Sequence, residues 1–229
     1  MHFVVIEGLD GAGKSTQINL LQDYLEQVKI PYKYLHFPRT DSQFFGEMIA
    51  RFLRGEFGDI NMVDPYIVAM LYAGDRMDAT SMIRTWIKSG NLVVVDRYVF
   101  SNIAFQCAKL RNPDNRERLR KWIIQLEYEY YKIPKPDINL FLDVPFKFTT
   151  QRLSQTREGS GRKYLNGKQD IHEASLDFQN RVRDIYLHEI NTDNSFRIIN
   201  CSKKNDGILP PEKIFEKILK TLKGNNIIK

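Results

Sequence analysis

A glycine-rich stretch near the start of the chain constrains the fold more than any other feature of the sequence. Gly8-Leu9-Asp10-Gly11-Ala12-Gly13-Lys14-Ser15 follows the apolar run Phe3–Ile6 and precedes apolar residues at helical spacing. This order of strand, glycine-rich loop and helix is the context in which the P-loop pattern occurs. A plain glycine turn would explain the glycines, but it gives no reason for Lys14 followed by Ser15. The stretch therefore predicts a phosphate-binding loop.

The chemistry of this loop suits the phosphates of a nucleotide. Glycines leave backbone N–H groups exposed to the phosphate, and the N-terminus of the following helix adds positive potential. In this pattern Lys14 reaches the terminal phosphates and the Ser15 hydroxyl binds Mg²⁺. The predicted nucleotide-binding residues are Gly8, Leu9, Asp10, Gly11, Ala12, Gly13, Lys14, Ser15 and Thr16.

Further apolar runs of strand length follow along the chain. They are Tyr34–Phe37, Leu92–Val95, Ile138–Val144 and Phe196–Ile199, and helical stretches separate them. Short apolar runs that alternate with helices predict a parallel β-sheet covered by helices on both faces. The chain is therefore expected to have an α/β fold.

Helices and one loop are expected between these runs. Two helical patterns lie between residues 39 and 87, and Asp64-Pro65 predicts the start of the second, because Asp caps helices and Pro fits their first turn. Apolar residues recur at helical spacing from Ile171 to Ile185 and again after Pro210-Pro211. Thr156–Gln169 combines glycines and basic residues without an apolar period, which indicates a mobile basic loop.

The composition favours one folded domain. A chain of 229 residues with 42% hydrophobic and 27% charged residues is well away from the composition of disordered chains. No apolar run approaches the roughly 20 residues of a membrane helix. Glu7 and Gly8 also interrupt the N-terminus before a secretory signal forms, so we expect a cytoplasmic protein without a membrane partner.

The cysteines, the histidines and the net charge say less about the function than the P-loop does. Cys107 and Cys201 form neither a disulfide scaffold nor a zinc cluster, and the four histidines show no metal or relay spacing. The net charge of +6 is compatible with nucleic acid, a membrane surface or small anionic substrates. Charge alone does not choose among these partners.

The third apolar run ends in a second polar motif, Asp96-Arg97-Tyr98. In a parallel sheet this motif lies at the carboxyl edge, beside the P-loop, where α/β proteins bind ligands. There Asp96 can hold Mg²⁺, usually through water, and Arg97 can hold a phosphate. An ion pair at the strand end is the alternative. The chain lacks the Asn-Lys-x-Asp stretch that reads guanine, which argues against a GTPase.

Together these motifs resemble the thymidylate kinase family. The resemblance covers most of the chain in the family's order, through Glu7–Thr16, Phe37–Arg39, Leu71–Arg76, Asp96–Ser101 and Lys135–Val144. It implies a three-layer P-loop kinase fold, with a five-stranded parallel sheet flanked by helices and a mobile lid at about residues 152–169. Residues 1–229 would form a single nucleoside monophosphate kinase domain. The implied reaction is ATP + dTMP to ADP + dTDP in dTTP synthesis, with Mg²⁺ and a homodimer.

The resemblance also implies roles for individual residues. Asp10 would approach the sugar 3′-hydroxyl of dTMP, Tyr72 would stack on thymine, and Arg76 would bond a base carbonyl. An aromatic in the apolar stretch Ile67–Tyr72 is otherwise more typical of a core. The other implied dTMP-binding residues are Arg39 and Arg97 at the phosphate and Ser101, Asn102 and Phe105 along the base and sugar pocket.

Positive charge, and no general base, is what this reaction needs. The acceptor phosphate is already mostly a dianion at pH 7, so the transition state needs cations around the transferring group. Some thymidylate kinases place an arginine directly after the P-loop acid, but this chain has Gly11, and the resemblance then assigns the charge to the basic lid. The predicted catalytic residues are Lys14, Arg97, Arg157 and Arg162, with Arg152 and Lys163 as further lid candidates, and the predicted metal-holding residues are Ser15 and Asp96.

The sequence suggests three alternative functions, and it argues against two of them. A kinase of another nucleoside monophosphate would share the fold. A nucleoside kinase would need a general base and usually an Arg-Ser after the third-strand acid, where this chain has Arg97-Tyr98. The basic residues 111–121 suggest a nucleic-acid-binding module, but their alternation with Glu117 favours a solvated helix face, so we expect no nucleic-acid partner.

Overall fold

A five-stranded parallel sheet in the order β2-β3-β1-β4-β5 forms the centre of the fold. The computed structural model describes residues 2–154, 160–168, 170–173, 175–205 and 207–229. All five apolar runs form strands, which confirms the α/β prediction. The strands are β1 (Phe3–Glu7), β2 (Tyr32–His36), β3 (Leu92–Asp96), β4 (Ile138–Asp143) and β5 (Phe196–Asn200).

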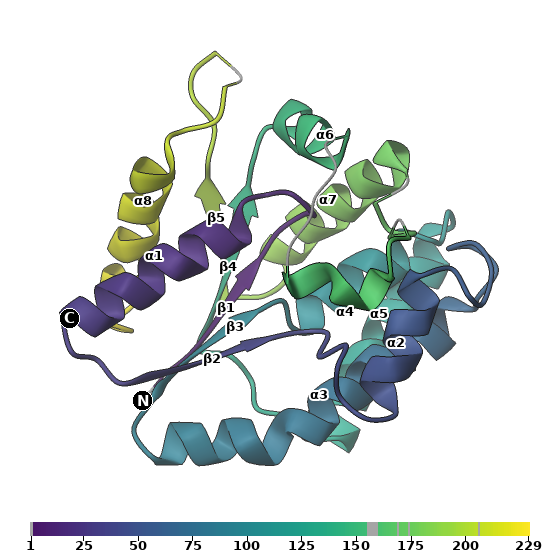
Figure 1. The fold of residues 1–229 in the computed structure, drawn as a ribbon, viewed down its shortest axis with the longest axis horizontal. Helices are drawn as coiled ribbons and strands as arrows, with labels where there is room; N and C mark the ends of the chain where they lie inside the picture. The colour runs from purple at the N-terminus through teal and green to yellow at the C-terminus, as the bar shows by residue number, and fades with distance from the viewer. Residues whose placement is uncertain (1, 155–159, 169, 174, 206) are drawn as a thin grey trace.

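Helices cover the sheet on both sides, which makes three layers (Figure 1). On one side α1 (Lys14–Gln27) packs against α8 (Pro211–Gly224). On the other side α4 (Val99–Cys107) packs between α3 (Pro65–Lys88) and α7 (Leu176–Ile190). The remaining helical elements are α2 (Phe45–Leu53), α5 (Pro113–Ile124), the π-helical turn η1 (Gln125–Tyr130), α6 (Phe146–Ser154) and the 3₁₀ helix η2 (Ser160–Leu165).

Burial explains why the central strands are continuous apolar runs. Every residue of β1 and β3 is buried, because helices cover both faces of the sheet. The edge strand β2 is only half-buried and leaves Tyr34 38% exposed. Glu7 is the exception in β1, since it is a fully buried carboxylate at the strand's carboxyl end. It therefore marks the edge at which the polar site forms.

The helix predictions are mostly confirmed, with two differences: α7 begins later than expected, and η2 lies within the segment that was expected to be a loop. Asp64 caps α3 by accepting a hydrogen bond of 2.8 Å from the Tyr66 N–H. The helix expected from Ile171 begins only at Leu176, where the Ser175 hydroxyl caps it. Ile171 lies before the helix because Asp170 accepts a hydrogen bond from the His172 N–H, a local turn that competes with helix formation.

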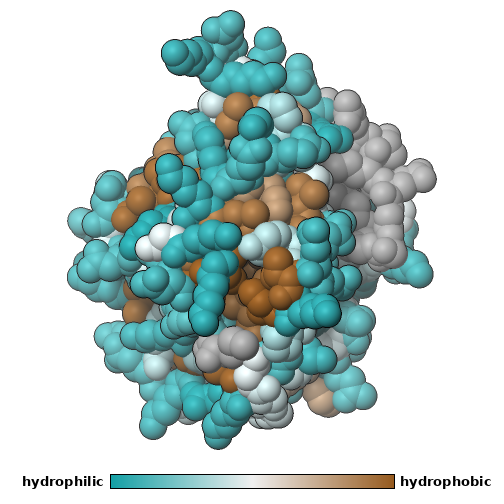
Figure 2. All heavy atoms as spheres, turned by 90° about the vertical axis from the view of Figure 1, so that its left-hand side faces the viewer, coloured by the Kyte–Doolittle hydropathy of each residue, from teal (hydrophilic) through white to brown (hydrophobic). Residues whose placement is uncertain are grey.

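The surface carries most of the charge. Figure 2 shows hydrophilic residues over most of one face, around a smaller hydrophobic area. The basic cluster on α5 is only partly solvated: Arg118 is exposed, but Arg120 bonds the fully buried Glu189 at 2.7 Å. Among the described residues, no helix is long and apolar enough to cross a membrane.

Candidate active site

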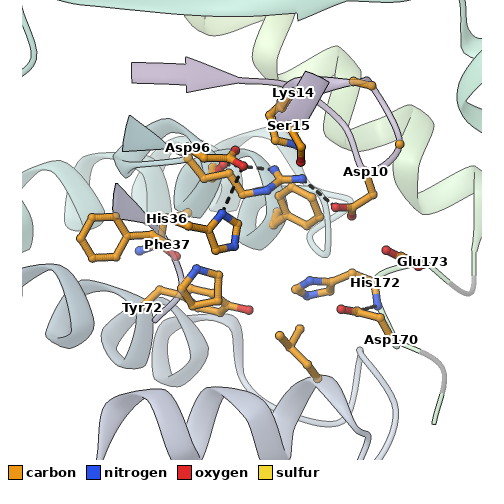
Figure 3. Close-up of a pocket in the computed structure, with 18 of the residues that line it drawn as sticks. Asp10, Lys14, Ser15, His36, Phe37, Tyr72, Asp96, Asp170, His172 and Glu173 are labelled. Atoms are coloured by element: carbon orange, nitrogen blue, oxygen red, sulfur yellow. Dashed lines mark hydrogen bonds and ion pairs between the residues drawn. The ribbon is translucent and has the colours of Figure 1, made fainter. Parts of the chain in front are cut away.

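A cavity of about 930 Å³ opens at the carboxyl edge of the sheet. The P-loop, the ends of β2 and β3, helices α3 and α4 and the segment after η2 all contribute to its wall (Figure 3). It brings together most of the site residues predicted from the sequence. These are Asp10, Gly11, Ala12, Gly13, Lys14, Ser15, Thr16, Tyr72, Arg76, Asp96, Arg97, Ser101, Asn102 and Phe105.

The P-loop has the backbone geometry that its glycines predict. Gly11 (φ 77°) and Gly13 (φ 83°) adopt left-handed conformations that side chains rarely tolerate, and Gly13 is the N-cap of α1. Lys14 Nζ donates to the carbonyl oxygens of Gly8 (3.3 Å) and Leu9 (3.1 Å). Gly8 and Leu9 thus support the lysine through their backbones. Burial lowers the pKa of Lys14 to about 8, so the ammonium form still predominates at pH 7.

Arg97, directly after β3, forms an ion pair with Asp10, the acid of the P-loop. Its guanidinium donates to Asp10 Oδ1 at 2.6 Å and to the Ser101 hydroxyl at 3.3 Å. Burial alone would disfavour the charge on Asp10, but Arg97 and Lys14 hold the pKa of that carboxyl well below its usual range. Arg97 is itself held in a left-handed conformation (φ 66°), a strained backbone of the kind that clusters at functional sites.

Asp96 has an oxygen available for a metal. Its carboxylate is buried, and Oδ2 lies 3.1 Å from His36 Nδ1, while Oδ1 has no hydrogen-bond partner among the described residues. Burial opposes its ionisation, but Lys14 and His36 keep its pKa below the usual value. Ser15 lines the same cavity. Carboxylate and hydroxyl oxygens suit Mg²⁺, which keeps several waters and takes few protein ligands beside substrate phosphates. The residues present therefore fit Mg²⁺.

A buried ion pair supports the part of the cavity wall that Arg76 and Asn102 form. Arg76 donates two hydrogen bonds to Glu127, at 2.5 and 2.7 Å, and the two side chains are 2% and 0% exposed. Asn102 Nδ2 donates to Glu127 Oε1 and to the Ala69 carbonyl, both at 3.0 Å. Both amide hydrogens of Asn102 are thus engaged, and its Oδ1 has no partner within the described part of the chain. Asn102 therefore offers a fixed hydrogen-bond acceptor.

Ser101 and Arg39 have protein partners in this structure, as Arg76 does. Ser101 lines the cavity, but its hydroxyl lies 2.5 Å from Glu7 Oε2 and 2.7 Å from the Tyr186 hydroxyl. Arg39 bonds Asp75 and Asp78, at 2.8 and 2.6 Å, and is not among the described residues that line the cavity. Tyr72, for which a core position was the alternative, lines the cavity, and Phe105 lines it as well while also packing in the core.

The lid predictions fall largely outside the described residues. Arg157 lies in the undescribed segment 155–159, and Arg162 lies on η2 with a side chain that the structure does not describe. Lys163 is exposed. Arg152, at the end of α6, lines the cavity. Arg152 is therefore the arginine of the lid region whose described side chain borders the cavity where phosphates would bind.

Several residues of the site were not found from the sequence. Glu7, Glu127 and Gln179 hold the side chains of predicted residues in place. His36 and His172, which showed no metal or relay spacing, both line the cavity. A carboxylate directly after the apolar run Phe3–Ile6 was a usable signal for Glu7. The histidines gave none, because each reaches the cavity from a different part of the chain.

Asp170, also on the cavity wall, should make stability depend on pH. Burial and the nearby Asp10 carboxylate raise the pKa of Asp170 from 3.8 to about 7. Between these values the folded protein keeps a proton that the unfolded chain has lost. The free energy of unfolding therefore falls as pH rises from about 4 to about 7, by at most about 1.4 kcal/mol per pH unit from this group.

We expect Asp170→Asn to remove this contribution. Its stability relative to the parent should rise between pH 5 and pH 8, as measured by urea unfolding at both pH values. Asp184→Asn, at an exposed position of α7, is the matched control and should show no such change. A stability difference that is the same at both pH values would contradict the raised pKa of Asp170.

Comparison with known proteins identifies the family. The thymidylate kinase family model matches residues 6–208. The thymidylate kinase of Dictyostelium discoideum is 28% identical over 229 residues, which cover 99% of this chain and 90% of that protein. A probable thymidylate kinase of Pyrobaculum aerophilum is 31% identical over 91% of this chain and 92% of its own. The solved structure of Candida albicans thymidylate kinase has the same fold, with a TM-score of 0.74 at 22% identity over 98% of this chain and 92% of that one. The family match across most of the sequence, together with the P-loop cavity, shows that this chain belongs to the thymidylate kinase family.

Proposed function

We propose that this protein transfers the γ-phosphoryl group of ATP to dTMP in the cavity at the carboxyl edge of its sheet. Family membership supports the reaction, and the single observation that carries it is the shape of the site. One cavity is lined both by the P-loop and by the fixed amide of Asn102. Donor phosphates and an acceptor nucleotide can therefore meet within it.

Cations at the P-loop end would stabilise the transferring phosphoryl group. Lys14 is ionised at neutral pH and would move from the loop carbonyls to the phosphates, while Arg97 would hold the acceptor phosphate from its position beside Asp10. Ser15 and Asp96 would hold Mg²⁺, which supplies charge neutralisation for the phosphates. Arg39 pairs with Asp78 in this structure. To bind the acceptor phosphate, as the family resemblance implies, it would have to leave Asp78 and pair with the phosphate.

The fixed amide of Asn102 supports selection of the base. Its free Oδ1 would accept a hydrogen bond from the N3–H of thymine. Cytosine has no hydrogen on N3, and its N3 is a hydrogen-bond acceptor. It would therefore face Asn102 Oδ1, another acceptor, in a buried site, and this repulsion costs binding free energy. Tyr72 would stack on the base from α3. Pyrimidines that carry an N3–H are therefore the expected acceptors.

A panel of monophosphates tests the assignment. With ATP and Mg²⁺, we expect dTMP to give the highest kcat/KM in a coupled ADP-release assay, ahead of dUMP and well ahead of dCMP, dGMP and AMP. Unfavourable contact at Asn102 should make dCMP at least about tenfold poorer than dTMP. Preference for a purine monophosphate would overturn the thymidylate assignment and leave the fold as described.

The lid arginines are proposed to add positive charge in the transition state. We expect Arg157→Ala or Arg162→Ala to lower turnover at least about tenfold, about 1.4 kcal/mol of barrier, with little change in the KM for dTMP. Arg118→Ala, at an exposed position of α5, is the matched control. If both single variants and the double variant turn over like the parent, the charge comes from Arg39, Arg97 or Arg152.

The family resemblance also supports a homodimer in the cytoplasm. Exposed apolar side chains on α3, including Ile67 (52% exposed) and Met70 (44%), offer one surface for such a contact. Gel filtration with light scattering measures the assembly state directly.

A further inference from the structure

The imidazole of His172 is a buried polar group of the cavity to which no role has yet been given. Its Nε2 has no hydrogen-bond partner among the described residues, and the residue is only 6% exposed. His172 lines the cavity, and Figure 3 shows its ring pointing into it. A buried polar atom without a partner costs free energy. Where such an atom faces a binding cavity, a ligand atom can complete the missing hydrogen bond.

Packing holds this imidazole in place. Its ring centroid lies 4.9 Å from that of Phe105, 5.5 Å from Phe52 and 5.8 Å from Phe178. Gln179 Nε2 donates to the His172 carbonyl oxygen and to Asp10 Oδ2, both at 2.9 Å, which ties the segment after the lid to the P-loop acid. Burial lowers the pKa of His172 to about 3. The ring is therefore neutral at physiological pH, with one nitrogen that donates and one that accepts.

The layout of the cavity indicates which part of the acceptor lies beside this ring. Phosphates belong at the P-loop end, and the base belongs beside Asn102 and Tyr72. The sugar must then lie between them. In Figure 3, Asp10 and His172 both point into the cavity from the same side, with Tyr72 opposite. Asp10, an ionised carboxylate, only accepts hydrogen bonds, whereas His172 Nε2 can donate when it carries the ring proton.

We propose that His172 Nε2–H donates a hydrogen bond to the 3′-hydroxyl of the acceptor nucleotide, while that hydroxyl donates its own proton to Asp10. A hydroxyl has one hydrogen to donate and lone pairs to accept, so one group satisfies both side chains. His172 is thereby a specificity-determining residue that selects acceptors with a 3′-hydroxyl. The inference rests on the proposed function, because it places the sugar between the base and phosphate ends.

The test measures variants of His172 with two substrates, one with and one without the 3′-hydroxyl. The parent, His172→Phe and His172→Gln are assayed with dTMP and with 3′-deoxy-dTMP, and the dissociation constant of each nucleotide is measured by calorimetry. We expect His172→Phe to lower kcat/KM and affinity for dTMP about tenfold, and to change those for 3′-deoxy-dTMP less than about twofold. His172→Gln should recover most of the loss, because its amide places a donor near the position of Nε2.

Two controls separate loss of the proposed hydrogen bond from nonspecific effects and from loss of folding. His188→Gln, at an exposed position of α7, should match the parent with both nucleotides. Thermal melting checks folding, and His172→Asn replaces the Phe variant in the cycle if that variant is unfolded. Equal losses with both nucleotides would show that His172 only packs, which overturns the inference. If the parent prefers another monophosphate, the proposed function fails, and the same cycle with that nucleotide and its 3′-deoxy form still decides whether His172 binds the hydroxyl.

Discussion

Lys14→Ala should lower turnover on the order of 10²–10³-fold with little change in thermal stability. The reason is that Lys14 carries a positive charge at the P-loop end of the cavity, and preorganised charges of this kind contribute that much to a transition state. Among the described residues, its Nζ donates to two backbone carbonyls, at 3.1 and 3.3 Å, and to no side chain. Lys14 itself lines the cavity, so a shortened side chain leaves space there that water can fill.

Initial rates with saturating ATP and dTMP give the turnover of this variant, and a melting curve gives its stability. Lys121→Ala is the matched control, since that lysine is 67% exposed on α5 and pairs only weakly with Glu117 at 3.4 Å. Unchanged turnover in a folded Lys14→Ala protein would refute the role assigned to the P-loop.

Glu127→Ala should cost about 3–5 kcal/mol of unfolding free energy, because it leaves the guanidinium of Arg76 buried without its charge partner. The pair is nearly inaccessible to water, with side chains 2% and 0% exposed. The same substitution removes one of the two acceptors of Asn102 Nδ2 and leaves that amide held by the Ala69 carbonyl alone. Affinity for dTMP should therefore fall as well. Urea unfolding and calorimetric titration measure the two effects separately.

Two further variants separate charge burial from simple packing. Glu117→Ala breaks exposed pairs on the neighbouring helix α5 and should cost less than about 1 kcal/mol. Arg76→Met with Glu127→Leu removes both buried charges and should recover most of the stability, since apolar replacements of a buried pair are often neutral. It should not recover dTMP affinity. If Glu127→Ala is as stable as Glu117→Ala, the Arg76–Glu127 pair does not contribute the unfolding free energy expected here.

The sequence by itself determined the layers and the phosphate-binding end of the site. Strand-length apolar runs, the glycines of residues 8–13 and the cap at Asp64 each act within a few residues, and local periodicity and turn chemistry are what a sequence displays directly. Asp96 and Arg97 were predictable for the same reason, because the end of a buried parallel strand defines where its side chains lie. The start of α7 was misplaced because the turn at Asp170 interrupts an otherwise helical pattern.

Only the tertiary structure decided how these side chains are partnered. Arg97 bonds Asp10, 87 positions away, Arg76 bonds Glu127, 51 positions away, and Gln179 reaches Asp10 across 169 positions. Such contacts depend on the order of the strands and on which helices pack together, and no short pattern records them. The same holds for His172, which lies on the same side of the cavity as Asp10 (Figure 3). Periodicity is a property of neighbours in sequence, whereas the polar network of the site is a property of neighbours in space.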